Sequence, residues 1–139
     1  MAALLYGGSR SMITGAAALR VYGLQVPGPD VTDLLVPMTT RRQSAGYLRI
    51  HRTRDLPRAR RSGHLRYAYP ARAVADAAQL LASVDDVYAV VAEAIQRQAC
   101  NLLQLRVEQK RAGVRDISLL QIVLEDIQAS ARSATSVPV

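Results

Sequence analysis

The sequence predicts an α+β fold in which a small three-stranded sheet, mixed or antiparallel, packs against about five helices. Two patterns along the 139 residues lead to this prediction. Apolar and polar residues follow strand-like patterns between residues 31 and 68, whereas apolar residues recur at helical spacing from Pro70 onward. A helix precedes the first strand, so the expected order is helix, small sheet and then four helices. The C-terminal half is therefore expected to be entirely helical.

The first helical elements are expected before the sheet. Residues 2–6 have the pattern of the end of a helix, and the two glycines that follow them are residues that commonly end helices. A further helix is expected from Ser11 or Thr14, either of which could cap it, to about Tyr22. The glycine at the next position is expected to end this helix.

Three strands are expected after a turn that contains two prolines and a glycine. Residues 31–36 form a short, mostly apolar strand, residues 47–54 alternate cleanly, and residues 64–68 alternate again. The intervening residues 37–46 are polar, and residues 56–63 are rich in arginine. Both of these segments are expected to be loops.

Four helices are expected after the sheet, each with a start signal of its own. Pro70 suits the first turn of the first of them. Ser83 can cap the second, which has two aspartates in its first turn, where the helix dipole favours negative charge. Asn101 opens a third that runs to about Ala112, and Asp116 can cap the last.

One domain over residues 1–133, with a flexible tail over residues 134–139, is expected from the length and the apolar content. The single cysteine, Cys100, excludes a disulfide framework and a multi-cysteine zinc site within one chain. The two histidines have no metal-ligand spacing, so neither a metal nor another cofactor is expected. No apolar run reaches the roughly 18 residues that a membrane span needs, and no export signal is recognisable. A cytoplasmic location is therefore expected.

Positive charge is concentrated between residues 41 and 66. The chain has a formal charge of +7, and nine of its 17 arginines lie in this segment, where only Asp55 opposes them. A clustered basic patch is typical of nucleic-acid binding. The residues expected to contact phosphates are Arg41, Arg42, Arg49, Arg52, Arg54, Arg60 and Arg61. Two other interpretations fit the same pattern: a solvated strand face that prevents edge pairing, and a docking surface for an acidic protein.

No catalytic set is recognisable, and the chain is not expected to be an enzyme. The sequence has no nucleophile elbow, phosphate-binding loop or dinucleotide fingerprint. An enzyme with His51 or His64 as its base is the least favoured alternative. Arg72 and Asp76 are four residues apart, so they share one face of the expected helix. A structural role is expected for this pair.

Several segments, taken in order and with their spacing, resemble actinobacterial AbiEi-type proteins. These proteins are antitoxins, or antitoxin-like transcriptional regulators, of type IV toxin–antitoxin systems. The resemblance extends from residue 2 to about residue 133. The segments that carry it are residues 4–8, 14–19, 22–24, 34–37, 50–53, 56–57 and 70–74, together with Asp76.

The resemblance implies the central domain of the family alone. Longer members carry an N-terminal winged helix-turn-helix that binds DNA, and many continue into a nuclease-like domain similar to very-short-patch-repair endonucleases. The implied function is a non-enzymatic antitoxin or regulatory domain that binds DNA or RNA weakly through its arginine-rich strands and loops. The alternative is an interaction module that docks an acidic protein, such as a cognate toxin. The apolar N-terminal residues 1–6 are expected either to pack on their own domain or to mediate a homodimer.

Overall fold

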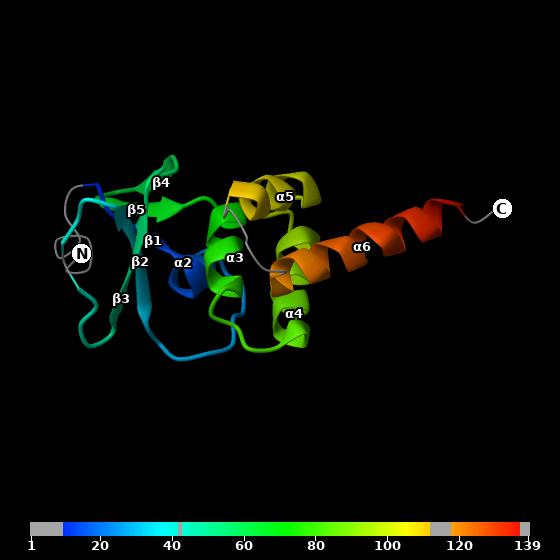
Figure 1. Ribbon diagram of the computed structural model, residues 1–139, viewed down its shortest axis with the longest axis horizontal. Coiled ribbons are helices and arrows are strands. Elements are labelled where there is room, and N and C mark those ends of the chain that lie inside the picture. The colour runs from blue at the N-terminus through cyan, green and yellow to red at the C-terminus, as the bar shows by residue number, and fades with distance from the viewer. Residues whose placement is uncertain (1–9, 42, 112–117, 137–139) are drawn as a thin grey trace.

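The computed structural model describes residues 10–41, 43–111 and 118–136. Within these residues it contains a five-stranded sheet and five helices. The helices lie on one side of the sheet, with α2 and α3 next to it and α4, α5 and α6 farther away (Figure 1). The α+β class predicted from the sequence therefore holds, whereas the predicted three-stranded sheet is wrong.

The sheet is mixed, and its strand order is β3-β2-β1-β5-β4. Neighbours β1 and β2 run antiparallel, as do β4 and β5, while β1 runs parallel to β5 and β2 parallel to β3. Because of this order, β3 and β4 form the two opposite edges. The strands are β1 (Met12–Thr14), β2 (Thr32–Pro37), β3 (Leu48–Thr53), β4 (Ala59–Ser62) and β5 (Leu65–Ala68).

The two strands absent from the prediction are β1 and β4. The three residues of β1 are all buried and run directly into a helix, so they show no alternation and resemble a first helical turn. The change of direction occurs at Gly15, whose φ of 61° is readily adopted only by glycine. The strand β4 is mostly charged, so it lacks an apolar face. Its pairing with β5 depends on a two-residue turn that starts at Gly63, with a φ of 63°.

Five helices follow the described chain in order. They are α2 (Gly15–Val21), α3 (Pro70–Ala78), α4 (Val84–Gln96), α5 (Leu102–Arg111) and α6 (Leu119–Ser136). Residues 134–136, which were expected in a flexible tail, are the last residues of α6. Residue 112, Asp116 and the N-terminal residues 1–9 lie outside the described residues, so the predictions made for them have no structural counterpart here.

Local sequence signals explain several helix starts. The Ser83 hydroxyl accepts a hydrogen bond from the Asp86 amide at 3.1 Å, which caps α4 as its sequence predicts. Asn101 and Gln104 cap α5 reciprocally, because each side chain accepts a hydrogen bond from the other residue's amide. Thr14 precedes α2 but makes no capping bond, since its hydroxyl donates to Asp76 instead.

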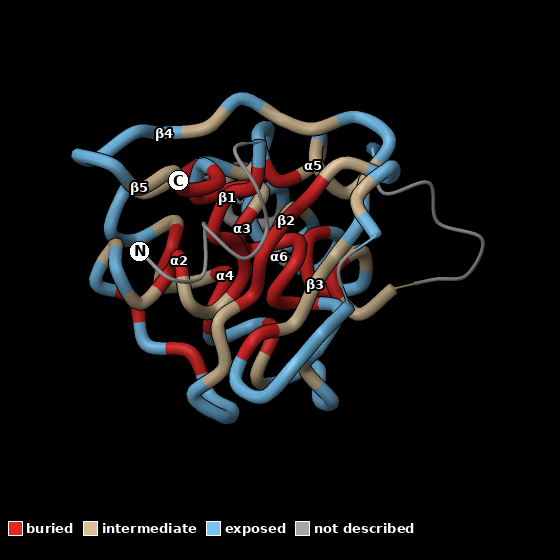
Figure 2. Tube along the Cα trace, turned by 90° about the vertical axis from the view of Figure 1, so that its left-hand side faces the viewer, coloured by how far each residue is buried: buried red, intermediate tan, exposed pale blue. Residues whose placement is uncertain are grey.

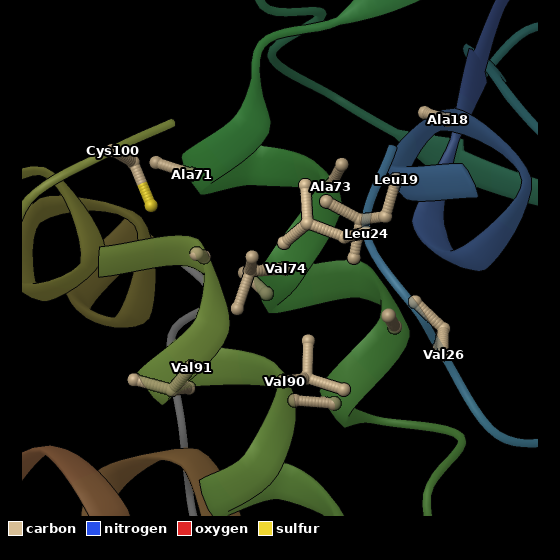
Figure 3. Close-up of a cluster of buried hydrophobic side chains, with 14 of the residues drawn as sticks. Ala18, Leu19, Leu24, Val26, Ala71, Ala73, Val74, Val90, Val91 and Cys100 are labelled. Atoms are coloured by element: carbon tan, nitrogen blue, oxygen red, sulfur yellow. The ribbon is translucent and has the colours of Figure 1, made fainter. Parts of the chain in front are cut away.

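The main core forms around α3, whose residues are almost all buried. Its many alanines allow α2 and α5 to approach closely, and Val74 packs among Leu19, Val90 and Val91 (Figure 3). Alternate strand residues such as Leu34 join the same cluster. The neighbouring positions form a second, smaller cluster on the other face of the sheet, which consists of Met12, Leu35 and Ala68 with Leu56 and Ala59 against it. Burial is greatest along the central strands, and the outer strand β4 is largely exposed (Figure 2).

Candidate nucleic-acid interface

The arginines of the basic segment do not form one surface. Those near β3 lie at one edge of the sheet, and those of β4 lie at the opposite edge, with β2, β1 and β5 between them. Four strand spacings separate the two edges, which amounts to roughly 19 Å. Residues 54–58 connect the edges, and Leu56 in this connection packs on the second hydrophobic cluster. The expected strand pair that shared one basic surface is therefore replaced by two separate arginine groups.

Arg49 is held by a buried carboxylate. Its Nε donates to Asp33 Oδ1 at 2.9 Å, and its Nη2 lies 3.4 Å from Asp33 Oδ2. His51 also contacts Asp33 Oδ1, through Nε2 at 2.8 Å. The Asp33 side chain is only 1% exposed, and a Cβ at Gly15 would lie 3.2 Å from its Oδ2. A buried carboxylate needs such partners, so this contact orders Arg49 within the fold.

The other arginines on this side lie at the end of β3 and in the loop before it. Arg52 is exposed, and its Nε donates to the Thr40 carbonyl at 2.9 Å. Arg41 and Arg54 are exposed as well, while Arg42 lies outside the described residues. We refer to Arg41, Arg52 and Arg54 as the β3 group.

The opposite edge carries a denser group on the β4–β5 hairpin. We refer to Arg58, Arg60, Arg61 and Arg66 as the hairpin group. Arg61 lies directly across from Arg66 in the strand register, and Arg60 lies across from Tyr67. Among the described residues, no carboxylate lies within ion-pair distance of any member of the hairpin group. The sequence offered a signal for this, because no acidic residue occurs from residue 56 to residue 75. Arg58 and Arg66 were counted in the basic segment but not predicted as contacts.

Tyr22 fixes the position of the hairpin relative to α2. Its hydroxyl donates to the Ala68 carbonyl at 2.8 Å, and its ring centroid lies 6.3 Å from that of Tyr67. The Arg60 guanidinium lies over the Tyr22 ring, 5.4 Å from its centroid. Burial raises the pKa of Tyr22, and the charge of Arg60 opposes that increase. The hairpin is thus attached to the helical layer while its other arginines extend along the edge.

Arg72 and Asp76 form the centre of a network that joins three elements. Arg72 Nε donates to both carboxylate oxygens of Asp76 at 3.1 Å, and the Thr14 hydroxyl donates to Asp76 Oδ2 at 2.6 Å. Arg72 Nη1 also lies 4.0 Å from Glu108 Oε2, a buried oxygen that has no hydrogen-bond donor. The network connects β1, α3 and α5, which is the structural role expected for the pair.

The groups considered for catalysis or metal binding lie apart. His51 contacts Asp33 on β3, and His64 is exposed at the turn of the hairpin on the other edge. Cys100 is buried, and burial raises the pKa of its thiol to about 11, so it stays protonated at neutral pH. In the part of the chain that the structure describes, no group of three or more His, Cys, Asp or Glu side chains is placed to hold a metal ion.

No helix within the described ranges is both long enough and apolar enough to cross a membrane. Comparisons of the chain with protein-family models, with curated proteins and with solved structures found no match.

Proposed function

We propose that the chain is a non-enzymatic nucleic-acid-binding domain, of the AbiEi-like antitoxin or regulatory type, that contacts phosphates through its β4–β5 hairpin. The observation that carries the proposal is the hairpin group: four arginines on one exposed sheet edge, with no carboxylate near them among the described residues. The segment resemblance supports the antitoxin-like part of the proposal.

The arrangement of the hairpin group favours an anionic ligand. Arg61 and Arg66 face each other across the strand pair, and like charges in that position destabilise a sheet. A phosphate between or beside them would relieve this repulsion. Guanidinium groups match the geometry of phosphate oxygens, and a two-stranded ribbon is narrow enough to enter the major groove of DNA. Contacts of this kind give affinity with little sequence preference.

The β3 group takes a secondary part in the proposal. Its exposed arginines could reach phosphates only at the opposite edge of the sheet, so one short duplex would not contact both groups in the same way. Arg49 contributes to folding rather than to binding, because Asp33 holds its guanidinium.

The first test compares two double variants that remove equal charge. Arg61→Ala with Arg66→Ala removes the facing hairpin pair, and Arg97→Ala with Lys110→Ala removes two exposed charges on α4 and α5. Fluorescence anisotropy with labelled duplex DNA and single-stranded RNA measures affinity at about 0.1 M salt. We expect the hairpin variant to bind on the order of 10- to 100-fold more weakly, because each phosphate contact contributes through counterion release. The control is expected to stay within about threefold.

The hairpin pair suits this test because its removal relieves repulsion, so weaker binding would not reflect a damaged fold. Equal losses in the two variants would contradict a localised site. If the unmodified chain binds neither nucleic acid even at low salt, the proposal fails. Docking of an acidic protein would then be the remaining interpretation of the basic surface.

A further inference from the structure

A groove of about 450 Å³ lies at the base of the hairpin, between residues 57–58, the start of α3, and α5. The two helices lie side by side here (Figure 1). Pockets that hold small ligands typically enclose roughly 300–1,000 Å³, so the groove is large enough for a group of that size. The lining residues that matter most are Arg58, Tyr69, Leu103, Val107 and Arg111.

The floor of the groove is apolar and unusually exposed. Leu103 is 74% exposed, and Val107, one helical turn later on α5, is also exposed. Tyr69 follows β5 directly and is 46% exposed. These three side chains come from two separate elements but line one groove, so they offer a flat apolar and aromatic surface to a ligand.

The rim of the groove is basic. Arg58 belongs to the hairpin group and is exposed at one side. Arg111 ends α5 and is 53% exposed, although its Nη1 lies 3.8 Å from Glu108 Oε1. Arg72 also lines the groove, but Asp76 holds its guanidinium. An aromatic ring among cationic side chains is the combination that single-stranded nucleic acids need, since bases stack on the ring and phosphates pair with the cations.

We propose that this groove binds an unpaired base of a single-stranded nucleic acid. The base stacks against Tyr69 above the floor formed by Leu103 and Val107, and the flanking phosphates contact Arg58 and Arg111. This inference rests on the proposed function, because Arg58 belongs to both surfaces. It adds a preference that the hairpin alone does not give: a base in a duplex must first unstack to enter the groove, so single strands bind more tightly than duplexes of the same length.

The test uses Tyr69→Ala and a matched control, Tyr88→Ala. Tyr88 lies on α4, does not line the groove, and is 43% exposed, so both variants remove an equally exposed ring. The probes are a labelled thymidine 12-mer and a labelled duplex of 12 base pairs. We expect Tyr69→Ala to weaken single-strand binding about 5- to 100-fold, as loss of a stacked base does elsewhere, and to leave duplex binding unchanged. Tyr69→Phe keeps the ring and is expected to bind like the unmodified chain.

The outcomes separate this inference from the proposed function. If Tyr69→Ala binds the single strand as tightly as Tyr88→Ala does, while the Arg61 and Arg66 double variant loses binding, the groove inference is overturned and the proposed function stands. Equal weakening of single-strand and duplex binding by Tyr69→Ala also overturns the inference. If the unmodified chain binds neither probe, both proposals fail. Circular dichroism of each variant shows that the fold is intact before binding is compared.

Discussion

Replacing Asp76 by alanine is expected to lower the free energy of unfolding by about 3–5 kcal/mol, the cost of removing one partner from a buried ion pair. Asp76 accepts hydrogen bonds from Thr14 and Arg72, so its loss leaves a buried hydroxyl and a guanidinium without their acceptor. Glu108 is affected as well, because Arg72 is then free to move away from its undonated oxygen. Since small domains are stable by only about 5–15 kcal/mol, this single change is expected to bring the protein close to unfolding.

Urea denaturation followed by circular dichroism measures this effect. Asp126→Ala on α6 is the control, because Asp126 is exposed and its replacement is expected to change stability by less than about 0.5 kcal/mol. A loss below about 1 kcal/mol in Asp76→Ala would contradict a structural network that joins β1, α3 and α5.

Replacing Asp33 by alanine is expected to have an effect of similar size, about 3–5 kcal/mol. Its carboxylate is buried and holds both Arg49 and His51, so the variant leaves two groups of the edge strand without their acceptor. Asp33→Asn is expected to cost less, because the amide oxygen still accepts one of these hydrogen bonds. Thermal unfolding of both variants gives the comparison.

A double-mutant cycle with Arg49→Ala separates this contact from general damage to β2. If Asp33 and Arg49 act together, the double variant loses less stability than the two single variants combined. Strict additivity of the two losses would show that the ion pair does not couple the residues, and Arg49 would return to the set of arginines available for phosphates.

Helices and their caps were the part of the fold most accessible from the sequence. Pro70 begins α3 and Ser83 caps α4 because both signals are local: the residue that forms the cap lies within three positions of the group it satisfies. The spacing of Arg72 and Asp76 is equally local. By contrast, β1 is only three residues long and fully buried, so it has no pattern of its own to detect.

The candidate site depended on contacts that local patterns do not encode. The charge count located the basic segment correctly, but the partner of Arg49 lies 16 residues earlier on β2 and becomes its neighbour only when β2 pairs with β3. The division into two arginine groups follows from strand order, which long-range pairing determines. The groove likewise needs α5 beside the start of α3, more than thirty residues away along the sequence.

The salt dependence of duplex-DNA affinity tests the central proposal, phosphate binding by the hairpin, most directly. The measurement compares the unmodified chain with a variant in which Arg58, Arg60, Arg61 and Arg66 are all alanine. Each phosphate contact contributes about 0.9 to the slope of log affinity against log salt concentration, so the variant is expected to show a slope shallower by about 3–4. An unchanged slope would contradict the proposal, because it would mean that the phosphates are neutralised elsewhere on the protein.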